Sequence, residues 1–256
     1  MGPKFFIIAG TAGSGKSTLT KLFGDWLESN DIPVVRVNLD PAAEDLPYTP
    51  NVDVRDYVDV YQVMRKYKLG PNGALLVSMD ILVNHSEEIS KEIYRNTTPR
   101  DYVLIDTPGQ LEIFAFRRGS QELIKNLVLD NKATIGFLMD SSLISSSLNV
   151  ISLLLLANSV YLRLRLPMIT IISKYDLLND EMKRVIDAMT EDPELINEII
   201  YKEDVPESGI EDLIEVAISR NYGLIPVSVY DDSTFEALFS ALQNSMNSID
   251  DIETSI

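Results

Sequence analysis

The sequence has no cysteine and a single histidine, His85. The lack of cysteine excludes disulfides, thiolate nucleophiles and cysteine-ligated metal sites, and one histidine makes a histidine-based metal centre implausible. Basic residues are also scarce, because 22 Lys and Arg stand against 39 Asp and Glu, giving a formal net charge of −17 at pH 7. Tight sequence-independent binding to nucleic acid needs excess Lys and Arg, so we expect no direct nucleic-acid partner. Any catalysis must use carboxylates, amides, hydroxyls, lysine and backbone groups.

Long apolar runs are missing as well. The longest, at residues 153–157, is far shorter than the roughly 20 apolar residues that a membrane-spanning helix needs. The apolar residues near the N-terminus lead directly into a glycine-rich segment that contains Lys16, which is unlike a secretory signal. We therefore expect a cytoplasmic protein with no membrane partner.

Short apolar runs of strand length alternate with longer segments of helical periodicity. The runs are residues 4–9, 34–39, 102–105, 134–139, 168–172 and 224–227. This alternation predicts an α/β fold with a doubly wound, mostly parallel sheet, and we expect one domain over residues 1–256.

Two segments are longer than a plain crossover requires. Residues 41–100 separate the second and third strands, where about a dozen residues would suffice. We predict a helical insertion there, with helices over 54–68 and 74–94 and a sharp break at 70–73. Residues 179–220 predict a further segment of short polar helices.

Residues 10–17, G-T-A-G-S-G-K-S, fit the phosphate-binding loop pattern G-x-x-x-x-G-K-[ST]. They lie between the first predicted strand and the first predicted helix, as this motif requires. Lys16 is expected to reach the β- and γ-phosphates, the Ser17 hydroxyl to ligate Mg²⁺, and Thr18 to lie near the α-phosphate. The residues predicted to bind nucleotide here are Gly10, Gly13, Ser14, Gly15, Lys16, Ser17 and Thr18.

The predicted strand V-L-I-D ends at Asp106 and is followed by T-P-G-Q. A parallel sheet uses such a strand-end carboxylate to approach the magnesium of a bound nucleotide, so Asp106 is a predicted metal residue. Capping of the following helix is the alternative role. Gly109 offers an N–H to a γ-phosphate, which makes residues 107–118 a candidate switch segment.

The strand at 168–172 leads into Ser173-Lys174-Tyr175-Asp176, which resembles the N/T-K-x-D guanine-recognition motif of GTPases. The resemblance implies that Ser173, Lys174 and Asp176 bind the base. Asp176 would accept hydrogen bonds from guanine N1–H and its amino group, where adenine presents an acceptor. Ser228 and Val229 follow the last strand, where such proteins carry a loop that caps the base.

Taken together, these motifs resemble the GPN-loop GTPases, a family of dimeric P-loop proteins named for the tripeptide found here at residues 70–72. The resemblance covers essentially the whole chain and implies a homodimer that binds GTP, GDP and Mg²⁺. It also implies that Asn72 addresses the partner's phosphates or the attacking water, and that the protein helps assemble complexes such as RNA polymerase. Without this resemblance, the sequence Gly-Pro-Asn-Gly would indicate a turn between two helices.

Hydrolysis needs a group that orients water in line with the γ-phosphate. Asp40, at the end of the second strand, is the first candidate, since related dimeric P-loop proteins keep a water-positioning Asp there. Capping, or support of the magnesium site, is the alternative role of Asp40. Gln110 is the second candidate because D-x-x-G-Q resembles the small G proteins. Glu44 and Glu112 are further candidates, and Lys16 completes the predicted catalytic set.

We therefore predict a Mg²⁺-dependent, homodimeric GTPase. One alternative is a P-loop kinase for a small molecule or a nucleic-acid end, although the acidic 179–220 segment does not suit a lid that closes over phosphate. The other alternative is a nucleotide-gated scaffold with negligible turnover.

Overall fold

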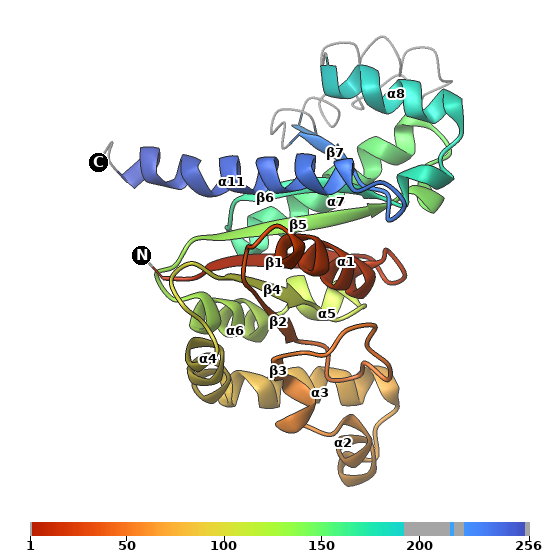
Figure 1. Cartoon of the computed structure of the whole chain (residues 1–256). Helices are drawn as coiled ribbons and strands as arrows, with labels where there is room; N and C mark the ends of the chain where they lie inside the picture. The colour runs from red at the N-terminus through yellow and green to blue at the C-terminus, as the bar shows by residue number, and fades with distance from the viewer. Residues whose placement is uncertain (1, 192–215, 218–222, 254–256) are drawn as a thin grey trace.

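The computed structural model describes residues 2–191, 216–217 and 223–253 of the chain. The described residues form a seven-stranded sheet in the order β3-β2-β4-β1-β5-β6-β7, and every pair of neighbouring strands is parallel (Figure 1). The strands are β1 (Lys4–Gly10), β2 (Val34–Asn38), β3 (Val52–Asp53), β4 (Tyr102–Asp106), β5 (Ala133–Asp140), β6 (Met168–Ser173) and β7 (Leu224–Pro226). The predicted doubly wound α/β fold is confirmed.

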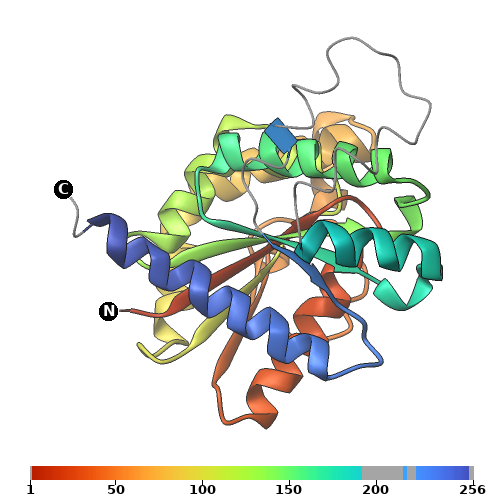
Figure 2. The same ribbon diagram turned by 90° about the horizontal axis from the view of Figure 1, so that it is seen from above.

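Helices cover both faces of the sheet (Figure 2). Helices α1 and α11 lie on one face, and α3 to α7 lie on the other. The α-helices are α1 (Lys16–Ser29), α2 (Val60–Tyr67), α3 (Pro71–Asn84), α4 (Ser86–Arg95), α5 (Leu111–Ala115), α6 (Arg118–Val128), α7 (Ser147–Leu164), α8 (Asp180–Glu191) and α11 (Ser233–Glu253). The described residues also include the short 3₁₀ turns η1 (Val54–Asp56), η2 (Ser141–Leu143) and η3 (Tyr175–Leu177).

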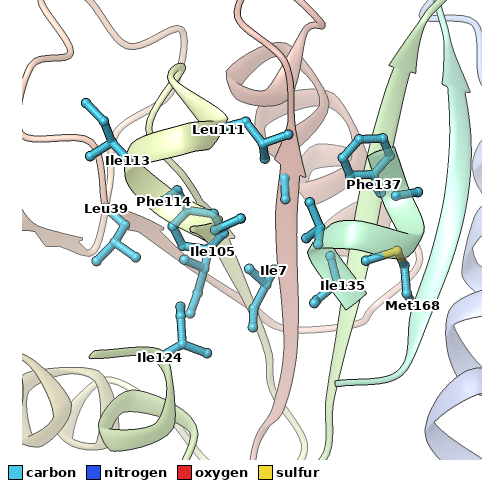
Figure 3. Packing of buried hydrophobic residues seen from close by; sticks show 14 of the residues in the cluster. Ile7, Leu39, Ile105, Leu111, Ile113, Phe114, Ile124, Ile135, Phe137 and Met168 are labelled. Carbon is cyan, nitrogen blue, oxygen red and sulfur yellow. The ribbon is translucent and has the colours of Figure 1, made fainter. Parts of the chain in front are cut away.

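The core is divided by the sheet, because successive side chains of a strand point to opposite faces. In β1, Phe5 and Ile7 enter the larger apolar cluster beneath α3 to α7, whereas Phe6 and Ile8 enter the smaller cluster beneath α1 and α11. Figure 3 shows Ile7 in the larger cluster, beside residues of β4, β5 and α5. Burial on both faces explains why the central strands read as continuous apolar runs.

The insertion at 41–100 differs from the prediction in its details. The predicted helix over 54–68 is wrong at its start, because Val54–Asp56 forms the 3₁₀ turn η1 and α2 begins only after the Asp59 cap. Just before it, Val52–Asp53 pairs with β2 as an edge strand that the sequence did not predict. The predicted break between two helices lies earlier, at residues 68–70, and residues 71–73 belong to the first turn of α3. Gly70 is its N-cap and Pro71 its first residue, where a missing N–H costs nothing.

Other boundaries also move. The predicted helix over 74–94 is divided at His85 into α3 and α4. Strand β5 continues one residue beyond the prediction, to Asp140. In the predicted polar segment at 179–220 the structure describes α8 and residues 216–217, and the rest of that prediction lies outside the described residues.

Helix α7 is the one helix among the described residues that is long and apolar enough to cross a membrane by length and composition. Its apolar residues pack into the larger core cluster, with Val150 and Ala157 fully buried and Leu153 and Leu154 nearly so. Helix α7 is therefore a core helix of this fold.

Strand register brings polar strand ends to one edge of the sheet. Asn38 is paired with Asp106, and Asp106 is paired with Ile8, two residues before the phosphate loop begins. On the other side of β1, Asp140 of β5 is paired with Ser173 of β6. The carboxyl edge therefore gathers the predicted phosphate, metal and base residues.

The sheet packs tightly against its core at Gly136. A Cβ atom at this position of β5 would lie 2.4 Å from Cζ of the fully buried Phe6 ring. We expect Gly136→Ala to lower the free energy of unfolding by about 1–3 kcal/mol, because the ring must shift in a filled core. Urea unfolding measures the change. Gly73→Ala is the control, since its added methyl meets only ordinary contacts at 3.5 Å, and equal stability of the two variants would contradict the prediction.

Candidate functional site

The phosphate loop connects β1 to α1 and has the backbone shape that its glycines allow. Gly13 and Gly15 have φ angles of 78° and 93°, in the left-handed region that favours glycine. Helix α1 begins at Lys16, so its unpaired backbone N–H groups face the loop. The Ser14 hydroxyl is buried without a hydrogen-bond partner. These features make the loop a site for an anion.

Lys16 is buried, with 6% of its surface exposed, and its ammonium donates to the carbonyl oxygens of Gly10 at 3.0 Å and Thr11 at 2.9 Å. Burial lowers the pKa of Lys16, although the nearby carboxylates of Asp106 and Asp40 oppose this shift. A bound phosphate would place negative charge beside this buried ammonium and so stabilise its protonated form.

Asp106 lies at the end of β4 and is 1% exposed. Its Oδ2 accepts a hydrogen bond from the Tyr48 hydroxyl at 3.0 Å, whereas its Oδ1 is buried with no partner. Burial raises the pKa of Asp106 to about 6, against the opposing effects of the Ser17 and Tyr48 hydroxyls and the Lys16 ammonium. The alternative capping role is wrong, because the N-cap of α5 is Gln110.

The residues present fit a magnesium ion. The unpaired Oδ1 of Asp106 is a hard oxygen ligand, and the Ser17 hydroxyl lies close enough to stabilise the ionised carboxyl. No cluster of three or more potential metal ligands is found in the described ranges. Mg²⁺ takes one or two protein ligands and fills its remaining positions with water and phosphate oxygens.

Asp40 follows β2 and joins two predicted site segments. Its Oδ1 accepts from the backbone N–H of Ala42 at 2.9 Å, and its Oδ2 accepts from that of Gly109 at 3.3 Å. Asn38 braces Asp40, accepting from its N–H and donating to its carbonyl. Asp40 therefore caps a local turn, and it also holds the N–H that we predicted for a γ-phosphate.

Asn72 and Gln110 meet within one chain. The Gln110 side-chain amide donates to Asn72 Oδ1 at 3.0 Å, which connects the first turn of α3 to the N-cap of α5. Together with the Asp40–Gly109 bond, this contact gathers three of the predicted hydrolysis residues around the switch segment. Glu112 is exposed on α5, and the Glu44 carboxylate accepts a hydrogen bond from the Tyr61 hydroxyl.

The base motif lies beside the phosphate loop. The Lys174 ammonium donates to the Gly13 carbonyl and to Asp140 Oδ2, each at 2.7 Å. The Ser228 hydroxyl donates to Asp176 Oδ1 at 2.9 Å, so the predicted base loop braces the predicted base carboxylate. Val229 is 38% exposed. The predicted phosphate and base subsites are therefore joined through Lys174.

Three residues at the site escaped the sequence reasoning. Asp140 was detectable, since it is a strand-end carboxylate like Asp40 and Asp106. Asn38 immediately precedes the Leu-Asp-Pro sequence and carries no distinctive signal. Tyr48 has none either, because it lies in an irregular loop and meets Asp106 only through the fold.

Known proteins resemble this chain in sequence. A family model described as "Conserved hypothetical ATP binding protein" matches residues 8–248. GPN-loop GTPase 1 of Dictyostelium discoideum is 31% identical over 75% of this chain and 50% of its own length. A GPN-loop GTPase of Pyrococcus abyssi is 40% identical over 69% of each chain. The chain belongs to the GPN-loop GTPase family.

The crystal structure of a GTPase in apo form from Pyrococcus abyssi matches with a TM-score of 0.82 and 31% identity, covering 94% of this chain and 97% of that one. This chain spans about half the length of the first curated relatives it matches. The tripeptide that names the family is Gly70–Asn72 here, at the start of α3.

Asp106→Asn tests the electrostatics of the site. A pKa raised to about 6 means that the folded state binds this proton more tightly than the unfolded state, so ionised Asp106 destabilises the fold above pH 6. We expect Asn to raise the free energy of unfolding at pH 7.5 by about 2–3 kcal/mol. The gain should shrink as pH falls through 6 toward 4.

Urea unfolding in EDTA at pH 7.5 and pH 5 measures this difference. Asp101→Asn is the control, since Asp101 is also buried but accepts from the Thr98 N–H at 2.9 Å. It should destabilise the fold at both pH values. A gain for Asp106→Asn that is the same at pH 7.5 and pH 5 would contradict the assigned pKa.

Proposed function

We propose that this protein is a Mg²⁺-dependent GTPase that hydrolyses GTP to GDP and phosphate and acts as a homodimer. The observation that carries the proposal is the Lys174 bridge, which joins the base motif to Gly13 of the phosphate loop. A single nucleotide can then occupy both subsites. The family name of the relatives supports the reaction.

The phosphates would bind the backbone N–H groups of residues 10–17, the N-terminus of α1 and the Lys16 ammonium. Bound Mg²⁺ would neutralise charge on the phosphates, held by Ser17 and Asp106. The oxygen of a water molecule then forms a bond to the γ-phosphorus while the bond to the β–γ bridging oxygen breaks.

The Asp40–Gly109 bond suggests how water is oriented. When the Gly109 N–H turns to a γ-phosphate oxygen, Asp40 Oδ2 loses its donor and becomes free to accept from water. Gln110 is the second group that can orient water, and it must then release Asn72. Binding of the γ-phosphate would thus replace hydrogen bonds within the protein by hydrogen bonds to the nucleotide. Such an exchange can order the segment in the GTP state and release it in the GDP state.

Guanine is the proposed base. Asp176 can accept from guanine N1–H and its amino group, and the Ser228 hydroxyl holds its Oδ1. Adenine presents an unprotonated N1 there, which leaves the carboxylate without a donor. The description of the family model names ATP, whereas the names of the relatives name a GTPase, so base preference is the property to measure first.

The dimer and the cellular role are proposed from the family resemblance. Asn72 would reach the partner's nucleotide, and its amide can both donate to a phosphate oxygen and accept from water. The cellular role would be assembly of a multi-subunit complex such as RNA polymerase.

Phosphate release from GTP and from ATP, with Mg²⁺ and across a range of protein concentrations, tests the proposal. We expect turnover selective for GTP, with a rate per chain that rises with concentration as dimers form. Asn72→Ala should reduce turnover by about 100-fold while GDP binding is retained, because one positioned polar group is lost. Asn126→Ala is the control, since Asn126 bonds Ser86 between α4 and α6, away from the site.

Other outcomes would select the alternatives. Equal turnover of GTP and ATP would refute guanine recognition. Faster transfer of the γ-phosphoryl group to an added acceptor than to water would indicate a kinase. Tight GTP binding without turnover at any concentration would indicate a nucleotide-gated scaffold.

Asp176→Asn tests the base assignment separately. An amide nitrogen there would face the guanine donors, so we expect GDP affinity to fall at least about 100-fold. Xanthosine diphosphate, whose C2 carries an oxygen, should bind the variant more tightly than GDP does. Isothermal titration measures both, with Asp187→Asn as the control, since Asp187 is exposed on α8 and its Oδ1 accepts from the Tyr175 hydroxyl. Unchanged GDP affinity would place the base elsewhere.

A further inference from the structure

Three consecutive residues at the end of β5 contact the first two residues of the base motif. The Ser173 hydroxyl donates to the Met139 carbonyl at 3.3 Å. The Lys174 ammonium donates to Asp140 Oδ2, and the Ser141 hydroxyl donates to the Lys174 carbonyl, each at 2.7 Å. Lys174 is therefore held at its side chain by the last residue of β5 and at its backbone by the first residue of η2.

Lys174 needs such support because its backbone is strained. Its φ angle is 55°, in the left-handed region, which costs a residue with a Cβ about 1–2 kcal/mol. Side-chain and backbone contacts that over-determine a strained residue are common where geometry serves function. The strain places the ammonium between Asp140 and Gly13.

The surroundings of Asp140 stabilise its ionised carboxylate. Its side chain is 7% exposed, its Oδ1 accepts from the Ser142 N–H at 2.9 Å, and its Oδ2 takes the Lys174 ammonium. Burial alone would raise the pKa of Asp140, but Lys174 and Ser142 together hold it below its ordinary value. Each carboxylate oxygen thus has a donor, and the anion is fixed in orientation.

We infer that Asp140 is a positioning residue for nucleotide binding, which holds the Lys174 ammonium against the Gly13 carbonyl and so fixes the base motif relative to the phosphate loop. The inference rests on the proposed assignment of residues 173–176 to the base. It gives the end of β5 a role that no motif in the sequence marks.

The position of the bridge determines which kinetic constants change. Lys174 contacts the phosphate loop at Gly13, whereas Asp40, Gly109 and Gln110 lie in the hydrolysis cluster with Asn72. Loss of the bridge should weaken binding of GDP and GTP by the same factor. The rate constant at saturating GTP should change little, because the groups around the γ-phosphate are untouched.

Asp140→Asn tests the inference, because it keeps the size of the side chain and removes the charge. We expect the dissociation constants of GDP and of a non-hydrolysable GTP analogue both to rise about tenfold, as for loss of one charged hydrogen bond. The kcat for GTP should stay within about twofold of wild type. Glu87→Gln is the matched control, since it breaks an ion pair of the same 2.7 Å length to Lys91 on α4 and should change neither constant.

A double-mutant cycle with Lys174→Met distinguishes a specific role from general damage. If Asp140 acts through Lys174, the double variant should bind GDP no more weakly than Lys174→Met alone. Additive losses would overturn the inference. Asp140→Glu, which restores the charge, should recover part of the affinity, and equal losses in the Asn and Glu variants would also overturn it.

Failure of the inference and failure of the proposed function are separable. Normal GDP affinity in Asp140→Asn beside weakened affinity in Lys174→Met would overturn only the role of Asp140. Normal affinity in Lys174→Met would overturn the base site itself.

Discussion

The register of the parallel strands is the constraint on which the rest of the structure depends. Asn38, Asp106 and Ile8 lie side by side across β2, β4 and β1, and Asp140 lies beside Ser173 across β5 and β6. A shift of one residue in any strand would exchange the side chains that face the two core clusters and carry its terminal group away from the edge. The packing that stabilises the core therefore also aligns the candidate site.

Burial of charge distinguishes this edge from an ordinary surface. The pKa of Lys16 is lowered and the pKa of Asp106 is raised, both with burial as the largest cause. Each shift costs folding free energy, and phosphate and metal are the ligands whose charges would relieve it. Asp140 shows the opposite case, because a lysine of its own chain satisfies its charge. The predicted phosphate site thus holds buried charges that a ligand would stabilise. The predicted base site is held by hydrogen bonds within the chain.

The switch segment is held by exchangeable contacts. Gly109 donates to Asp40 and Gln110 donates to Asn72, and neither bond is part of the apolar core. A ligand that offers better acceptors can replace such bonds without disturbing the packing beneath, where Leu111 and Phe114 of α5 are buried. The fold therefore combines a packed apolar support with a polar layer whose hydrogen bonds a ligand can replace, as the proposed reaction requires.

The sequence by itself determined the α/β class, the phosphate loop, Asp106 and the base motif, because each depends on contiguous residues or on the period of a single element. Only the tertiary structure decided that Val52–Asp53 joins the sheet, that residues 70–72 begin α3, that Tyr48 meets Asp106 and that Asp140 holds Lys174. Glycine and proline suit a turn and a helix start equally well. The two side-chain pairings depend on which strands and loops become neighbours, and strand order leaves no mark in local sequence.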